Sequence, residues 1–206
     1  MHSKKLQQEK LLMKSKNKKS QKSKKLSLKG KTILHVLTGS IAAYKSGDLV
    51  QLFRSEGARP VCVLTEGAKQ FVTPVTLRAL SGEMVYDDLF TRETPFDVLH
   101  TSLAEEADVV LISPASANFI ARLAVGLADD LASCIVLATQ KPVILVPAMN
   151  DNMYNHPLTQ ENLQKLKKIG YSIIDPEHGH LVCGKEAIGH IASNEAILSF
   201  VQQKLK

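Results

Sequence analysis

The amino-acid sequence predicts an α/β fold, a doubly wound parallel sheet in a flavodoxin- or Rossmann-like three-layer sandwich. Two observations predict it: short apolar runs recur from residue 31 to the end of the chain, and segments with helical spacing separate them. This alternation is typical of βαβ units, in which helices cover both faces of a parallel sheet. Because parallel crossovers are right-handed, the units wind into one sheet with helices on either side.

Each predicted strand is rich in Val, Ile and Leu, as strands buried on both faces are. The predicted strands are 32–38, 60–65, 107–115, 142–150 and 171–175. The predicted helices are 42–56, 73–82, 118–126, 129–139, 158–169 and 194–204. Gly57 ends the first helix, since glycine tolerates the left-handed backbone that follows a helix.

The positive charge of the chain is concentrated at its N-terminus. The 206 residues carry a net charge of +6, but residues 1–30 hold eleven Lys and one acidic residue, Glu9, so the remaining residues carry −4. The first 30 residues have no aromatic residue and little to bury, which predicts a disordered Lys-rich tail. Nonspecific contact with nucleic acid, anionic lipid or ribosomes is the alternative role for the tail. Residues 31–206 are predicted to form one folded domain.

Neither a membrane-spanning segment nor a secretory signal is predicted. No run approaches the roughly 18 apolar residues that a membrane span needs, and the N-terminus lacks the apolar region of a signal peptide. We therefore expect a soluble, cytoplasmic protein without membrane contact.

Three scattered cysteines argue against a disulfide framework, which is rare in cytoplasmic proteins. Cys62 and Cys134 lie in apolar runs and are predicted to be buried thiols. No cysteine or histidine pair has zinc-ligand spacing, so no metal site is predicted. Cys183 lies in "HGHLVCGKEAIGHIA" (178–192), where glycines favour a loop, and a chemical role for its thiol stays open.

Ligands of such sheets bind outside the carboxyl ends of the strands. The segments there are "TGSIAAYKSG", "TEGAKQF", "SPASANF" and "PAMNDNM", which are rich in small and polar residues. Gly39 and Ser40 could present donors to a phosphate at a helix N-terminus, or Ser40 could simply cap that helix. Asn118 and Asn150 could bind a ligand or stabilise turns. No dinucleotide fingerprint or P-loop is present, so a mononucleotide fits better.

Four motifs, in this order and spacing, resemble the homo-oligomeric flavin-containing cysteine decarboxylases. They are "TGSIAAYKS", "HTSLAEEADVVLISPASANFIARLAVGLADDL", "PAMNDNMYNHP" and "LVCGKEAIG". The family includes phosphopantothenoylcysteine decarboxylases, peptidyl-cysteine decarboxylases of lantibiotic synthesis and Hal3-type proteins. The resemblance covers the chain from residue 31 to the last helix and is greatest to the first group. It implies FMN as cofactor and decarboxylation of 4′-phosphopantothenoylcysteine to 4′-phosphopantetheine in coenzyme A biosynthesis.

The resemblance also implies roles for individual residues. His100 is the catalytic histidine, Cys183 is a proton-donating thiol on a substrate-clamping loop, and Asn150 holds the substrate carboxylate. Leu181 and Val182 also contact substrate. The residues expected to bind FMN are Gly39, Ser40, Ile41, Thr65, Ser116, Ala117, Asn118 and Phe119. FMN would oxidise the substrate thiol, which creates the electron sink that decarboxylation needs. Thr101, Phe119 and His190 differ from the residues that the family usually carries.

The family further implies a homotrimer or dodecamer whose flavin sites are completed across the interface. A separate phosphopantothenate–cysteine ligase is expected, because no ligase domain follows before Lys206. The alternatives are a decarboxylase for another cysteine-terminated substrate, a prenyl-transferring flavoprotein, a non-catalytic Hal3-like FMN-binding subunit, and a plain nucleotide-binding domain. A prenyl-transferring protein would not need the Cys183 loop, which argues against it.

Overall fold

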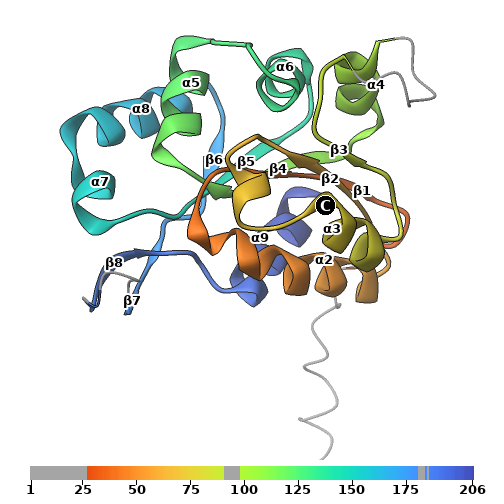
Figure 1. Ribbon diagram of the computed structural model, residues 1–206, viewed down its shortest axis with the longest axis horizontal. Helices are drawn as coiled ribbons and strands as arrows, with labels where there is room; N and C mark the ends of the chain where they lie inside the picture. The colour runs from red at the N-terminus through yellow and green to blue at the C-terminus, as the bar shows by residue number, and fades with distance from the viewer. Residues whose placement is uncertain (1–26, 91–97, 181–183, 185) are drawn as a thin grey trace, which may run out of the picture.

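The computed structural model describes residues 27–90, 98–180, 184 and 186–206. Its central feature is a parallel sheet of six strands in the order β3-β2-β1-β4-β5-β6 (Figure 1). The strands are β1 (Thr32–Leu37), β2 (Arg59–Leu64), β3 (Val85–Tyr86), β4 (Val109–Ala115), β5 (Val143–Pro147) and β6 (Ser172–Ile173). Because β1 and β4 are neighbours, the winding direction of the sheet reverses between them, where such folds bind ligands.

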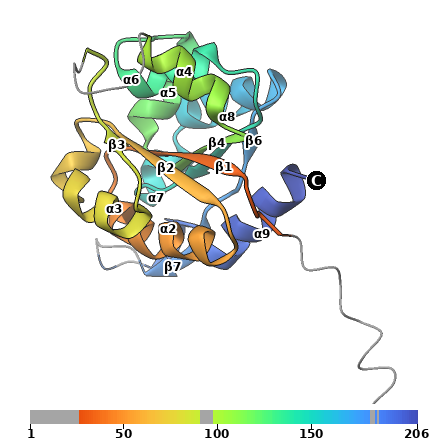
Figure 2. The same cartoon turned by 90° about the vertical axis from the view of Figure 1, so that its right-hand side faces the viewer.

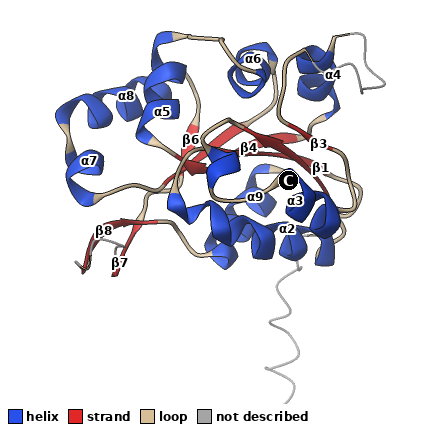
Figure 3. Ribbon diagram, viewed as in Figure 1, coloured by secondary structure: helices blue, strands red, loops and turns tan. Residues whose placement is uncertain are grey.

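Helices cover both faces of the sheet, which confirms the predicted three-layer sandwich (Figures 2 and 3). One face carries α4 (Leu99–Glu106), α5 (Ala117–Val125), α6 (Leu131–Ala138) and α8 (Pro157–Lys168); the other carries α2 (Ser46–Ser55), α3 (Pro74–Ser81) and α9 (Asn194–Lys204). The short helix α7 (Asp151–Asn155) leads into α8, and two 3₁₀ segments, η1 (Ile41–Lys45) and η2 (Ala68–Gln70), follow β1 and β2.

The sequence of strand β1 is an almost unbroken apolar run because the strand is buried on both faces of the sheet. Leu34 and Val36 are buried in the cluster formed with the α4–α8 layer, whereas Ile33 and Leu37 are buried in the clusters on the α2, α3 and α9 side. Successive side chains of a strand point to opposite faces, so a strand covered on both faces needs apolar residues at nearly every position.

All five predicted strands and all six predicted helices are present, although the first helix is divided into η1 and α2. The sequence analysis missed α4, α7, β3 and an antiparallel hairpin of β7 (Glu177–His180) and β8 (Glu186–His190). Strand β3 has only two residues, and the hairpin sequences "EHGH" and "EAIGH" lack an apolar run. Neither gives a periodic signal long enough to detect.

The packed body begins before the predicted domain boundary at residue 31. Leu28 is 1% exposed and belongs to the cluster under α2 and α9. The backbone N–H of Gly30 also donates to the carbonyl oxygen of Gly57. Residues 28–30 therefore belong to the domain, while most of the predicted tail lies outside the described residues. None of the helices described is long and apolar enough to cross a membrane.

The two cysteines that the structure describes differ in environment. Cys62 is fully buried in β2, as predicted. Cys134 is only partly buried, and its Sγ lies 3.6 Å from the carbonyl oxygen of Ala128. The prediction of a buried thiol at Cys134 is therefore wrong. The apolar run around it forms α6, and a helix that covers a sheet turns part of its surface to solvent.

Candidate functional site

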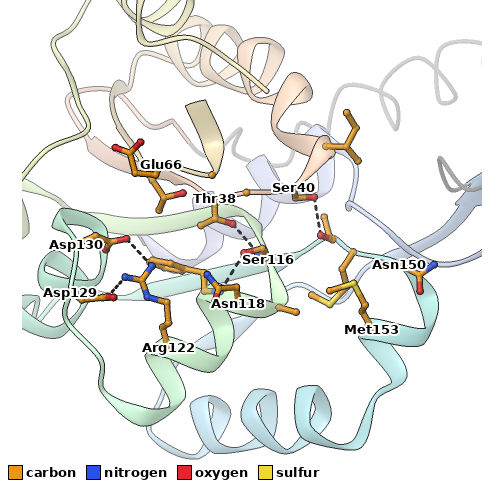
Figure 4. Close-up of a pocket in the computed structure, with 18 residues that line it drawn as sticks. Thr38, Ser40, Glu66, Ser116, Asn118, Arg122, Asp129, Asp130, Asn150 and Met153 are labelled. Carbon is orange, nitrogen blue, oxygen red and sulfur yellow. Dashed lines mark hydrogen bonds and ion pairs between the residues drawn. The ribbon is translucent and has the colours of Figure 1, made fainter. Parts of the chain in front are cut away.

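A cavity of about 690 Å³ lies at the carboxyl edge of the sheet, between the segments that follow β1, β2, β4 and β5 (Figure 4). This is the edge at which the sequence predicted the site. Nine residues with predicted cofactor or substrate contacts line it: Gly39, Ser40, Ile41, Thr65, Ser116, Ala117, Asn118, Phe119 and Asn150. Residues far apart in the sequence therefore meet in one cavity of the size usual for small-ligand sites.

Thr38 connects the ends of β1 and β4. Its hydroxyl donates to the carbonyl oxygen of Pro114 at 2.7 Å and accepts from the backbone N–H of Ser116 at 2.8 Å. Ser116 is in turn the N-cap of α5, because its Oγ accepts from the N–H of Phe119. The first N–H groups of a helix have no partner within it, so Ala117 and Asn118, which line the cavity, place such groups at its wall.

Ser40 has the capping role that was one of the two alternatives left open by the sequence. Its Oγ accepts from the N–H of Ala42 at 3.4 Å and caps η1. The hydroxyl also donates to the carbonyl oxygen of Ala148 at 2.9 Å. A hydroxyl has a single proton to donate, so in this arrangement Ser40 holds the loop together and the donors left for an anion are backbone N–H groups.

Two glycines let the loops after β1 and β2 approach each other closely. A Cβ atom built on Gly39 would lie 3.2 Å from the Cα of Gly67, and one built on Gly67 would lie 3.0 Å from the Cα of Gly39. Contacts this short are tighter than most Cβ contacts, so a side chain at either position would push the loops apart by a few tenths of an ångström. The glycine of "TGS" therefore favours the close approach of two cavity-lining loops.

Charged residues that the sequence analysis missed form one wall of the cavity. Arg122 donates to Asp130 at 2.9 Å and pairs with Asp129, and its guanidinium lies 5.9 Å from the ring centre of Phe119. Asp130 also forms a capping box with Ser133 at the start of α6. This Asp–Ser spacing ahead of an apolar run was the signal in the sequence that could have identified Asp130.

The charge of this wall limits how the cavity can bind an anion. Among the described residues that line it, Arg122 is the only cation, and Glu66, Asp129 and Asp130 are acidic. Both aspartates are already paired with Arg122. A bound phosphate would therefore depend on neutral donors and on the positive end of the α5 dipole.

Phe119, which differs from the usual family residue, packs into the core. It is 1% exposed and lies in the cluster beneath α5. Its aromatic ring stabilises the helix and supports Arg122, while its backbone N–H bonds to Ser116. The Phe119 side chain has no polar atom, so it cannot form a hydrogen bond with the predicted cofactor.

The structure does not bring His100 to the cavity. His100 lies in the first turn of α4, which packs against α6 (Figure 1). It is not among the described residues that line the cavity. Cys183, Leu181 and Val182 lie outside the described residues. The strands on either side of them, β7 and β8, form the hairpin, and the carbonyl oxygen of Gly189 accepts from the N–H of Met149 at 3.2 Å. The base of the hairpin thus contacts the turn that carries Asn150.

His190, another departure from the family pattern, links the hairpin to η1. Its Nε2 lies 3.0 Å from the Nζ of Lys45, and its Nδ1 lies 3.0 Å from the carbonyl oxygen of Ile191. Lysine can only donate and a carbonyl can only accept. In this arrangement Nε2 accepts from Lys45 and Nδ1 donates to the carbonyl oxygen of Ile191.

A buried histidine in β1 also contacts the segment that leads to the site. His35 is completely buried in β1, and its Nε2 lies 2.7 Å from the carbonyl oxygen of Ser113. Burial lowers the pKa of His35 to about 4, against the smaller opposing effect of that hydrogen bond. His35 is therefore neutral at physiological pH and donates its Nε2 proton to the turn that precedes α5.

A Rossmann strand order with a cavity where the winding reverses is typical of the class of nucleotide-binding α/β proteins. No group of metal-ligating side chains is found within the described part of the chain. The model of the Flavoprotein family matches residues 21–206. The chain belongs to this family.

Named relatives resemble the chain over most of its length. It is 44% identical over 174 residues to "Coenzyme A biosynthesis bifunctional protein CoaBC" of Haemophilus influenzae, a match that spans 84% of the chain but only 44% of that relative. It is 40% identical over 177 residues to "Probable phosphopantothenoylcysteine decarboxylase" of Streptococcus mutans, across 85% of the chain and 99% of the relative.

Two solved structures have the same fold. A PPC decarboxylase mutant complexed with pantothenoylaminoethenethiol superimposes with a TM-score of 0.76 and 32% identity, covering 84% of the chain and 97% of that structure. The FMN-dependent cysteine decarboxylase SpaF superimposes with a TM-score of 0.77 and 27% identity, covering 87% and 99%. These likenesses agree with the predicted fold and family.

Proposed function

We propose that the chain is an FMN-dependent decarboxylase that converts 4′-phosphopantothenoylcysteine to 4′-phosphopantetheine in coenzyme A biosynthesis. The observation that carries the proposal is that residues from the loops after β1, β2, β4 and β5 line the same cavity. The relative from Streptococcus mutans, matched over nearly its whole length, supports the same substrate. A soluble, cytoplasmic location follows from this pathway.

The cavity fits a flavin mononucleotide. Gly39 and Gly67 keep two loops free of side chains at its edge, and the N-terminus of α5 offers backbone donors to a phosphate. Ile41, Met149 and Met153 add apolar surface suited to a flat ring. When bound, FMN would supply the two-electron oxidation of the substrate thiol and the later return of the hydride.

Asn150 is placed to orient the substrate carboxylate. Its side-chain oxygen accepts from the N–H of Asn152 at 2.9 Å and caps α7. That bond fixes the orientation of the amide, so its NH₂ group is the part that can donate to a carboxylate. A neutral donor holds the carboxylate without stabilising its charge so strongly that loss of CO₂ becomes harder.

His100 would act across a subunit interface. In a single chain it lies outside the cavity, so we assign it to the cavity of a neighbouring copy within a homotrimer, which could assemble further into a dodecamer. Exposed apolar side chains support such an interface: Phe90 and Val98 flank the segment before His100, and Val125 and Leu137 lie on α5 and at the end of α6. Phe90 is 83% exposed and Val125 72%, which favours burial by a partner.

Cys183 would protonate the product and complete the reaction, with Leu181 and Val182 beside the substrate. The contact between Gly189 and Met149 supports this role, because it holds the base of the hairpin beside Asn150. A separate ligase would supply the substrate by joining cysteine to phosphopantothenate. Contact of the Lys-rich tail with nucleic acid would be weak and nonspecific.

Incubation of the purified chain with 4′-phosphopantothenoylcysteine tests the proposal, with products followed by mass spectrometry and bound flavin by visible absorbance. We expect a flavin spectrum and a product lighter by one CO₂. A flavin spectrum without turnover would contradict the substrate and favour a peptide substrate or a regulatory subunit. Protein that binds no flavin under reconstitution with FMN would overturn the proposal as a whole.

A further inference from the structure

Residues 113–116, the end of β4 and the turn into α5, are held by two side chains from β1 and from the residue that follows it. His35 contacts the carbonyl oxygen of Ser113 at 2.7 Å, and Thr38 contacts the carbonyl oxygen of Pro114 at 2.7 Å. Ser46 of α2 makes a longer contact of 3.4 Å with the carbonyl oxygen of Ser113. The backbone N–H of Ser116 returns to Thr38 at 2.8 Å (Figure 4). Three consecutive peptide groups ahead of α5 are thus fixed from the neighbouring strand.

The hydroxyl of Thr38 is used completely by these contacts. It donates its single proton to Pro114, which directs a lone pair toward the N–H of Ser116. Thr38 is 1% exposed although it borders the cavity. Its polar atom therefore acts on the turn, and through the turn on α5, instead of on a ligand.

The position of α5 matters because no described residue that lines the cavity offers an unpaired cation to a phosphate. Arg122, the only cation among the described lining residues, is paired with Asp129 and Asp130. Binding of a dianionic group then depends on the aligned N–H groups at the N-terminus of α5, which begins directly after Ser116. Hydrogen bonds to charged groups are stronger than neutral ones but sensitive to geometry.

We propose that Thr38 is a positioning residue that gives the cavity its preference for phosphorylated flavin over riboflavin, by holding the 113–116 turn and hence the N-terminus of α5. The inference rests on the proposed flavin site. It separates two contributions to binding: the walls of the cavity recognise the flavin ring, whereas the turn fixed by Thr38 recognises the phosphate.

The test compares the affinities of FMN and riboflavin for the full-length apoprotein, measured by quenching of flavin fluorescence. In Thr38→Val, which has nearly the same shape but no hydroxyl, we expect the ratio of the two affinities to fall about tenfold, while riboflavin affinity stays unchanged. Thr38→Ser keeps the hydroxyl and should retain the wild-type ratio. Thr139→Val is the matched control, since Thr139 bonds to Ala104 away from the cavity.

Two results would overturn the inference. One is an unchanged ratio of FMN to riboflavin affinity in Thr38→Val, whether or not both affinities fall. The other is a fall of this ratio in Thr38→Ser, which would assign the effect to the methyl group. If Thr38→Val does not fold, Thr38→Cys replaces it: the ratio must fall for Cys and persist for Ser. Wild-type protein that binds neither flavin would instead refute the proposed function, so the two failures are distinguishable.

Discussion

Ser40 donates a hydrogen bond from its side-chain hydroxyl to the carbonyl oxygen of Ala148, 2.9 Å away and 108 positions later in the sequence. The bond joins the loop after β1 to the loop after β5. The N–H of Ala148 also donates to the carbonyl oxygen of Ala115 at the end of β4. The side of the cavity assigned to the cofactor and the turn that carries Asn150 are therefore one connected unit.

Removing the Ser40 hydroxyl should weaken flavin binding. In Ser40→Ala, the loop after β1 loses both its bond to Ala148 and the cap of η1, so we expect the affinity for FMN to fall about tenfold. Titration of the apoprotein with FMN measures the change. Ser55→Ala removes an exposed hydroxyl that bonds only within α2 and should bind FMN normally. Equal affinities in both variants would contradict the role of Ser40.

His100→Asn should retain FMN but lose release of CO₂, because His100 is the proposed catalytic group and lies outside the cavity of its own chain. The measurement is product formation by mass spectrometry together with the flavin spectrum. Normal turnover in this variant would remove His100 from the mechanism.

Complementation tests whether His100 acts in a neighbouring copy. His100→Asn and Asn150→Ala should each be inactive alone. Co-expressed with random mixing, they should restore about a quarter of the sites, since a quarter then pair an intact Asn150 with an intact His100 from a neighbour. Activity that stays absent in the mixture would place both residues in the same chain.

The sequence predicted the sheet and the cavity well because both depend on local patterns. Buried parallel strands have apolar runs in their sequences. The residues that follow these strands meet at the carboxyl edge of the sheet, regardless of the conformation of the loops. Ser116, Asn118 and Asn150 could therefore be assigned to one site from their positions alone.

The remaining features depend on contacts between distant residues. In the sequence nothing distinguishes Thr38; its role depends on the hydrogen bonds of its hydroxyl with Pro114 and Ser116. Arg122 likewise resembles any helix residue in the sequence, and only the structure shows its ion pairs with Asp129 and Asp130. The location of His100 also could not be predicted, because α4 has only eight residues, too few for a clear periodic signal in the sequence.

Asp130→Ala should destabilise the protein by about 2 kcal/mol, since it removes the N-cap of α6 and leaves Arg122 with one partner fewer. Urea unfolding measures the change. Asp129→Asn is the control: Asp129 pairs with the same Arg122 but its side chain is 53% exposed and caps nothing, so its loss should cost less than about 1 kcal/mol. A larger cost for Asp129→Asn would mean that the ion pair matters more than the cap.

Cys62 should be inert toward iodoacetamide in the native protein. Burial raises the pKa of its thiol to about 12, so almost no reactive thiolate exists near pH 8. The apolar cluster around Cys62, which includes Leu37 and Val50, shields the sulfur from the reagent. Peptide mass spectrometry should detect alkylated Cys62 only after unfolding in urea. Cys134, which is partly exposed, should be alkylated first. The reverse order would indicate that β2 opens before α6.

His35 should make the protein less stable as the pH falls. Its pKa is about 4 in the folded protein, because burial disfavours the charged ring, and 6.5 is the ordinary value expected after unfolding. Above pH 6.5 both states are neutral at this position, so His35 adds no pH dependence. Between about pH 6.5 and pH 4 only the unfolded chain takes up the proton, which favours unfolding by about 2 kcal/mol at pH 5.

Urea unfolding near pH 7.5 and pH 5, for wild type and His35→Gln, measures this effect. Glutamine can still donate to the carbonyl oxygen of Ser113 but does not titrate, so the variant should lose about 2 kcal/mol less than wild type between the two pH values. Other titrating groups affect both proteins alike and cancel in the comparison. Equal losses would mean that His35 can be protonated without unfolding. Its ring Nδ1, which has no partner among the described residues, would then find one in the folded state.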